Sequence, residues 1–491
     1  MSHPTARARR LSSLALAALI ASVPSVTAQT AHSAGKVPIS TASAEAKADF
    51  VKGRTLAENL RAHESREFLR RAVAKDPDFA LAHLSLANSA PTPKEFFDHL
   101  GHAVALSGKA SAGERLMILG AQAGANADPA RQLEHYQRLV AEFPQDERAH
   151  FLLGGTYFGQ QEYDKAIEEY RRSTAIAPDF APAYNIMGYA YRTAGRYREA
   201  EQAFKKYIEL IPNDPNPYDS YAELLMKMGR FDESIAQYRK ALKVNPEFAP
   251  SFLGIASNLA LQGKYDASRA EAKKLYDRAR NDGEKRGAMF AVTATYAEEG
   301  KFDLALAELD KQYALGEKIG DAAAMAGDAI FMGNVLLESG KPAEALKKFE
   351  QAVQVTEASQ LSAEVKENAK RLHRFNAARV AIATKDLATA KREGDAFLRE
   401  SQAKKNRFQI RLGHEVAGRI ALEEKNYDGA LTHLEQANQQ DPYNLYRMGL
   451  AYEGKGDHAK AKEMFRKAAD FNQLPTLNSA FARAKTRKLK A

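Results

Sequence analysis

Residues of the same kind recur every 34 positions through the middle of this 491-residue chain. Small residues keep this interval at Gly120, Gly154, Gly188, Ala222 and Ala256. Three other series keep step with them: Tyr163, Tyr197, Phe231 and Tyr265; Tyr136, Tyr170, Phe204 and Tyr238; and Pro144, Pro178, Pro212 and Pro246. A shared period of this length predicts an array of similar supersecondary units rather than one compact core.

The repeated positions fit a pair of helices. A Gly inside a helix costs about 1 kcal/mol relative to Ala, so its recurrence indicates that a second helix approaches closely there. Gly195, Gly229 and Gly263 predict the end of the first helix, because Gly readily adopts the left-handed conformation found there. The second helix then carries the recurring aromatic residues, and a proline ends it. Each unit is therefore a helix-turn-helix that buries its apolar face against the next unit.

The unit containing Leu153, Gly154, Tyr157, Ala166, Tyr170 and Pro178 resembles the tetratricopeptide repeat. Weaker matches extend upstream to Gly53 and downstream to Gly449, where the irregular spacing predicts longer connections or extended helices. The resemblance implies an all-α, right-handed superhelical solenoid of about twelve units.

A break in the pattern near residues 278 to 286 divides the predicted solenoid. We expect an N-terminal solenoid at residues 45 to 280 and an irregular C-terminal solenoid at residues 281 to 475. A last helix within residues 476 to 491, which carries a basic tail, is expected to cap the exposed end of the stack.

The first residues resemble a targeting segment. Arg7, Arg9 and Arg10 precede an apolar run that is followed by small residues ending at Ala28. This pattern predicts a signal peptide at residues 1 to 28, cleavage near Ala28, and a periplasmic or secreted protein. A membrane anchor is the alternative, but a spanning helix needs about 20 mostly apolar residues and serines interrupt this stretch. Residues 29 to 44, rich in Ala and Ser, are expected to form a flexible tether.

The sequence offers little for catalysis or for cofactors. The chain has no cysteine, which excludes disulfides, thiolate metal sites and catalytic thiols. Common nucleophile, zinc and phosphate-binding motifs are absent. His99 and His102 have the spacing of a two-ligand metal site, but two neutral ligands alone make a poor one. We therefore predict no catalytic residue, no cofactor and no metal.

The charged residues predict a solvated surface. The net charge is +9, and basic residues alternate with acidic ones, which argues against a nucleic-acid-binding stripe. Adjacent carboxylates such as Glu298 and Glu299 point about 100° apart on a helix, so they are also expected to face solvent. The C-terminal tail holds the one dense basic patch, which could contact an anionic surface: Arg483, Lys485, Arg487, Lys488 and Lys490.

The resemblance also implies a function and a place for it. In this family the first helices of successive units line a concave groove that receives peptides or partner helices. Carried over to this chain, the groove positions are Phe151, Gly155, Phe158, Asn185, Tyr189, Arg192, Asp219, Glu223 and Lys227. We expect a non-catalytic protein-protein interaction scaffold, acting in cell-envelope assembly.

Two alternatives differ from the scaffold in kind. One is an all-helical carbohydrate-active enzyme, and the strict period and the lack of converging carboxylates argue against it. The other is a surface-anchoring module that acts through the basic tail.

Overall fold

The computed structural model describes residues 35 to 490, apart from the side chains of Lys488 and Lys490. The predicted signal peptide at residues 1 to 28 lies outside this range. Within it the chain forms twenty-five α-helices, one short 3-10 helix (Ser107–Lys109) and no strand. The predicted all-α solenoid is confirmed.

The helices form twelve pairs and a final helix, which agrees with the predicted number of units. The first helices are α1 (Ala44–Glu58), α3 (Ala80–Asn88), α5 (Ala112–Ala125), α7 (Glu147–Gly159), α9 (Ala181–Thr193), α11 (Asn216–Lys227), α13 (Ala249–Leu261), α15 (Asp282–Glu299), α17 (Ala322–Glu338), α19 (Ala363–Ala383), α21 (Arg407–Glu423) and α23 (Pro442–Gly454). The second helices are α2 (Ala62–Lys75), α4 (Pro93–Leu106), α6 (Pro129–Glu142), α8 (Tyr163–Ile176), α10 (Tyr197–Leu210), α12 (Phe231–Val244), α14 (Tyr265–Arg278), α16 (Phe302–Lys318), α18 (Pro342–Ala358), α20 (Leu387–Ala403), α22 (Tyr427–Leu434) and α24 (His458–Ala469), and the chain ends with α25 (Leu477–Lys490).

The small repeated residues lie where the two helices of a pair touch. A Cβ atom on Gly188 would lie 2.7 Å from the ring of Phe204, a separation at which the two helices would have to move apart. Gly195 follows the same helix with a φ of +77°, in the left-handed region that Gly tolerates. Both expectations from the repeat are confirmed.

The later units differ from the earlier ones in helix length. From α7 to α14 the helices contain 12 to 14 residues, whereas from α15 to α21 they contain 17 to 21. The irregular spacing in the sequence therefore comes mainly from extended helices. Several later units also end their first or second helix on a left-handed Lys instead of Gly, at Lys385, Lys405 and Lys425.

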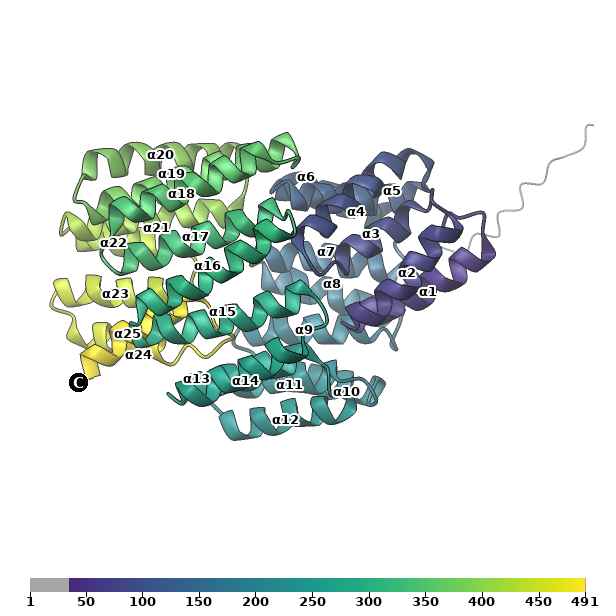
Figure 1. Ribbon diagram of the computed structural model, residues 1–491, viewed down its shortest axis with the longest axis horizontal. Coiled ribbons are helices and arrows are strands. Elements are labelled where there is room, and N and C mark those ends of the chain that lie inside the picture. Colours follow the sequence, from purple (N-terminus) through teal and green to yellow (C-terminus); the bar gives the residue numbers. More distant parts are fainter. Residues whose placement is uncertain (1–34, 491) are drawn as a thin grey trace, which may run out of the picture.

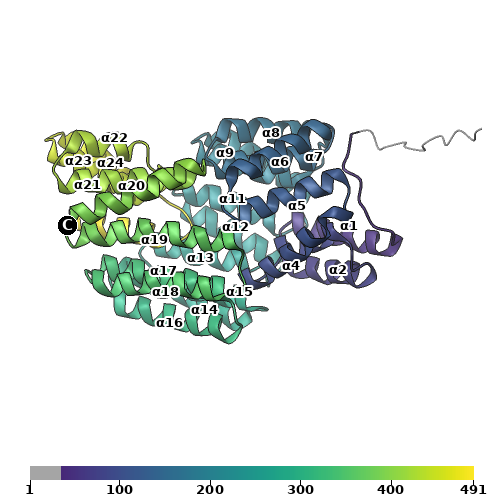
Figure 2. The same cartoon turned by 90° about the horizontal axis from the view of Figure 1, so that it is seen from above.

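The array curves until later units meet earlier ones (Figures 1 and 2). The backbone N–H of Lys94 on α4 donates to Asp321 Oδ2 at 3.0 Å, just before α17 begins. The side chain of Asn406 donates to the carbonyl of Ala127 at 3.1 Å, and Arg411 donates to the carbonyl of Gln160 at 2.9 Å. These contacts fix the curvature of the inner surface, which the first helices line.

Helix α25 does not cap the end of the stack, so this expectation is wrong. Residues 470 to 476 carry the chain back, and α25 packs against α15, α17, α23 and α24 (Figure 1). Three of these four are first helices, so α25 lies on the inner surface. Its apolar residues explain the position, because Leu477, Ala480 and Phe481 are all buried there.

The start of the described chain also differs from the expectation. Residues 35 to 43 were expected within a flexible tether, yet they are attached to the first helices of two later units. The N–H of Val37 donates to Asp146 Oδ2 at 2.9 Å, and that of Ser40 donates to Glu114 Oε1 at 2.8 Å. Acidic residues at the starts of α5 and α7 thus hold this extended segment, and the prediction of a tether is wrong for these residues.

Candidate binding groove

The inner surface of the first four helix pairs contains a cavity of about 1000 Å³. Leu81 and Leu84 on α3, Met117 on α5, and Phe151 and Leu152 on α7 form an apolar floor. A smaller cavity of about 340 Å³ shares the α7 residues and continues along α7 toward the start of α21. A concave, mostly apolar site of this size is typical of a binding site. We refer to the larger site as the N-terminal cavity.

A cluster of charged residues forms one wall of the N-terminal cavity. Arg148 on α7 binds both carboxylate oxygens of Glu58 on α1, at 2.6 and 2.9 Å, and also contacts Glu147. Burial disfavours the charge of Arg148, but the bond to Glu58 together with the charges of Glu58, Glu147 and Asp146 outweighs burial and raises the pKa of Arg148. Lys36 lies 2.7 Å from Glu147 at the same wall. The bidentate pair fixes the wall between the first and fourth units.

Arg54, one turn before Glu58 on α1, is in a different situation. Its Nε lies 3.9 Å from Glu58, too far for a hydrogen bond, and it has no acceptor among the described residues. Its guanidinium lies 5.2 Å from the centre of the Phe50 ring. Burial and then the charge of Arg148 lower the pKa of Arg54. Arg54 is thus a cation of the cavity wall whose Nε has no acceptor among the described residues.

The predicted groove residues of α9 and α11 bind one another. Tyr189 OH donates to Glu223 Oε1 at 2.9 Å, and Arg192 donates to Glu223 Oε2 at 3.0 Å. Ser251 on α13 donates to Asp219 Oδ1 at 2.7 Å. These bonds connect three first helices into a polar ladder. Burial and then the charge of Glu223 raise the pKa of Asp219 well above its usual range, although the Ser251 bond opposes the shift.

The remaining predicted positions have separate surroundings. Phe151 and Gly155 line the cavities described above. Phe158 packs edge-on against Tyr163, with ring centres 5.6 Å apart. Asn185 is 3% exposed, so it belongs to the interior. Lys227 Nζ lies 3.3 Å from the centre of the Phe471 ring, and burial lowers its pKa to about 8.

Past the polar ladder, α25 fills the inner surface. Leu477, Ala480 and Phe481 join an apolar cluster with Leu309 on α16 and Met332 on α17. The Phe481 ring lies 6.4 Å from the rings of Phe302 and Tyr443. An amphipathic helix thus occupies the later part of the groove. We refer to the surface of α15, α17 and α23 that it covers as the C-terminal groove.

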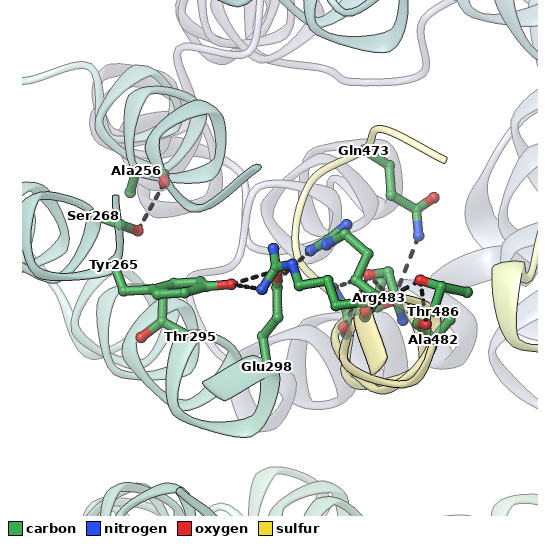
Figure 3. A network of polar contacts seen from close by, with 12 residues as sticks. Ala256, Tyr265, Ser268, Thr295, Glu298, Gln473, Ala482, Arg483 and Thr486 are labelled. Carbon is green, nitrogen blue, oxygen red and sulfur yellow. Dashed lines mark hydrogen bonds and ion pairs between the residues drawn. The ribbon is translucent and has the colours of Figure 1, made fainter. Parts of the chain in front are cut away.

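The basic residues of α25 face acidic residues of the C-terminal groove. Arg483 and Arg487 bind the two oxygens of Glu298 at 2.7 and 2.5 Å, and Figure 3 shows the polar network around Glu298 with Arg483 and Tyr265 labelled. Lys485 Nζ lies 2.8 Å from Glu338, which also accepts a bond from Tyr443 OH. Burial opposes the charge of Lys485, but Tyr443 and Glu338 together raise its pKa.

Two expectations about these charges need correction. Glu298 is only 4% exposed and does not face solvent. Arg483 of the predicted basic surface patch is buried and paired with Glu298, whereas Lys485 and Arg487 are paired with Glu338 and Glu298 and stay 36% and 44% exposed. The side chains of Lys488 and Lys490 lie outside the described part of the structure.

Sequence reasoning also missed several groove residues. Met117 stands 34 positions before Phe151, so the repeat could have identified it as a groove position. Arg54 and Glu338 lie outside the regular series, and no motif marks them. His83 joins His99 and His102, with ring centres 6.0 and 5.2 Å away.

The described residues lack two further kinds of feature. Over residues 35 to 490, no three His, Asp or Glu side chains gather closely enough to hold a metal ion. None of the helices that the structure describes combines the length and the apolar character needed to cross a membrane.

The fold and the groove define a helical-repeat scaffold. Family models of the tetratricopeptide repeat match residues 122–181, 191–250, 222–283 and 442–473. Together with the repeated residues and their packing, these matches show that the chain contains tetratricopeptide repeats, a fold whose concave surface serves protein interaction.

The solved structures that are similar to this chain have a low sequence identity with it. MamA is 22% identical over 33% of this chain and 94% of its own, with a TM-score of 0.28. A tetratricopeptide repeat protein from Parabacteroides merdae is 16% identical over 67% of this chain and 98% of its own, with a TM-score of 0.33. No curated protein matches the chain significantly.

Proposed function

We propose that the N-terminal cavity binds an apolar helical segment of a partner protein. The observation that carries this proposal is that the C-terminal groove of the same array already holds a helix, α25. The N-terminal cavity offers the same combination of an apolar floor and a charged wall, and about 1000 Å³ of it is unfilled by the described chain. The two sites use the same first-helix surface in different units.

The contacts of α25 indicate how such a helix is recognised. Leu477, Ala480 and Phe481 are spaced so that they share one face of the helix. Partner helices bind grooves through apolar residues with this spacing. Each fully buried apolar side chain contributes about 2 kcal/mol, so three anchors supply about 6 kcal/mol. Micromolar binding needs about 8 kcal/mol beyond the cost of association, so contacts with the charged wall must add to the apolar anchors.

A displayed library of peptides of about 16 residues, selected on the full chain, tests this proposal. Leu152 is half-buried and lines both cavities, so Leu152→Gln should weaken the selected peptides at least about tenfold, a loss of about 1.4 kcal/mol. Leu304 on α16 provides a matched control, because it is 48% exposed and lies away from the groove. Failure to enrich any peptide, or equal weakening by Leu304→Gln, would contradict the proposal. Circular dichroism checks that both variants fold.

We further propose that the protein acts in the periplasm or after secretion, as a scaffold in cell-envelope assembly. The basic and then apolar sequence before Ala28 supports export. Mass spectrometry of the chain from fractionated cells should find a mature N-terminus near Gln29 outside the cytoplasm. An intact N-terminus in the cytosolic fraction would contradict this part of the proposal.

We propose a non-catalytic role, because binding accounts for the groove without a reaction. The floor of the N-terminal cavity is apolar, and most charges of its wall are paired. This arrangement does not favour the carbohydrate-active alternative, which needs carboxylates placed on both sides of a glycosidic bond.

A further inference from the structure

Arg54 lacks a carboxylate of its own at the wall of the N-terminal cavity. Glu58 is its nearest acidic neighbour, but both Glu58 oxygens accept bonds from Arg148. The Arg54 Nε is buried and has no acceptor among residues 35 to 490. A buried donor without an acceptor costs about 1 to 3 kcal/mol, and more when it is charged.

Apart from the exposed Lys47, the other charges of this wall have partners. Arg148 and Lys36 both contact Glu147. Asp146 accepts from the backbone N–H groups of Val37, Arg148 and Ala149. The acidic groups of the wall are therefore hydrogen-bonded to residues other than Arg54, and no hydrogen bond to a wall carboxylate competes with a partner's carboxylate for the Arg54 guanidinium.

Arg54 is also held in a defined position. Its guanidinium lies against the Phe50 ring at 5.2 Å, and Phe50 is fully buried. A cation fixed over an aromatic ring loses little side-chain entropy when it binds an anion. Lys47 lies on the same face of α1, two turns before Arg54. It is exposed at the same cavity and adds positive charge.

We propose that Arg54 binds an Asp or Glu side chain of the partner segment, next to the apolar residues that enter the N-terminal cavity. This inference rests on the proposed function and names the chemistry of the partner as an acidic amphipathic helix. A guanidinium can bind a carboxylate with two parallel hydrogen bonds, which a lysine ammonium cannot reproduce.

The two ends of the groove then have opposite preferences. The C-terminal groove presents Glu298 and Glu338 to the basic helix α25. The N-terminal cavity presents Arg54, which would repel a helix with the charges of α25. The chain's own C-terminal helix, in the same molecule or in a second copy, is therefore a poor occupant of the N-terminal cavity.

Three blocked helical peptides of about 16 residues test the inference. They share leucines at i, i+3 and i+7 and differ at one neighbouring position, which is Glu, Gln or Lys. In fluorescence anisotropy with the full chain, the Glu peptide should bind about tenfold more tightly than the Gln peptide, and the Lys peptide should bind most weakly. Arg54→Met should abolish the difference between Glu and Gln while the Gln peptide keeps its affinity.

Two further variants control this experiment. Arg54→Lys keeps the charge and should lose most of the preference for Glu, which separates bidentate recognition from simple attraction. Arg138→Met is a matched change at an exposed residue of α6 and should leave the preference intact.

Each outcome has a distinct meaning. Equal binding of the Glu and Gln peptides to the unmodified chain would overturn the inference and leave the proposed function standing. Binding of none of the three would count against both. A peptide of residues 477 to 490 that displaces the Glu peptide with equal affinity would overturn the argument from charge.

Discussion

The two ends of the inner surface are built alike and are used differently. Both have an apolar floor on first helices and a wall of charged residues. At the C-terminal groove α25 covers the floor, so Phe481 and Glu298 are buried as part of the core. At the N-terminal cavity the floor faces about 1000 Å³ of unfilled space. One kind of repeat surface therefore stabilises the protein where it is covered and leaves an open cavity, our proposed docking site, where it is not.

The largest effect is expected at the buried ion pair of the C-terminal groove. Glu298→Ala leaves Arg483 buried without its carboxylate, because Arg483 is only 7% exposed. Removing one partner of a buried pair costs about 4 kcal/mol. Urea denaturation should show this loss, whereas Glu168→Ala at an exposed pair should cost less than about 1 kcal/mol. Similar losses for both variants would show that α25 is not docked as described.

A pair of Phe→Ala variants compares the two floors directly. Phe481→Ala empties a fully packed position and should cost about 3 kcal/mol. Phe151→Ala at the N-terminal cavity should cost about 1 kcal/mol, because its side chain is only partly covered. Peptide binding should show the reverse order, with a large loss for Phe151→Ala alone. Equal costs in stability would contradict the difference between the covered and the open floor.

The polar ladder between the two sites should respond to pH. The folded-state pKa of Asp219 is raised above its ordinary value of 3.8, so the folded protein holds this proton more tightly than the unfolded chain does. Stability from this group is therefore lost as pH rises above about 4. Asp219→Asn removes the titration and still offers an acceptor to Ser251.

Asp219→Asn should therefore be more stable than the unmodified chain by about 1 kcal/mol at pH 7, and equally stable below about pH 4. Thermal unfolding at several pH values measures this difference. A gain that is the same at both ends of the pH range would show that the carboxyl group of Asp219 is not the cause.

The smallest effect concerns the turns of the later units. Lys425 is exposed and has a φ of +59°, where a Cβ atom causes strain that Gly avoids. Lys425→Gly should raise the unfolding midpoint by an amount equivalent to about 0.5 kcal/mol, because greater freedom of the unfolded chain offsets part of the gain. Lys404→Gly is a matched control at a φ of −83° and should not stabilise. If both changes lower the midpoint, the turn strain is not as described.

Most of the fold can be predicted from the sequence because the repeated residues are those that pack the two helices of a unit together. Gly188 and Phe204 recur with their units, and each unit contacts mainly its neighbours, so their period gives the helix pairs directly. Helix starts such as Tyr163 and Tyr197 follow from the same series.

The sequence does not predict contacts that depend on the curvature of the whole array. Helix α25 is amphipathic, but only the arrangement of α15, α17 and α23 determines which surface it covers. Glu298 resembles any solvated helix carboxylate until Arg483 approaches it from 185 positions away. The 34-residue period predicts Phe151 as a groove position, and Phe151 does line the cavity. Arg54 lies in the first unit, where the repeat is less regular, so the period does not mark it.

Hydrogen exchange with and without the bound Glu peptide tests the central claim most directly. The account predicts slower exchange on α1, α3, α5 and α7 when the peptide binds, with α25 equally protected in both states. Slower exchange on α15, α17 and α23, together with loss of protection in α25, would contradict it, because the peptide would then have replaced the helix that the C-terminal groove already holds.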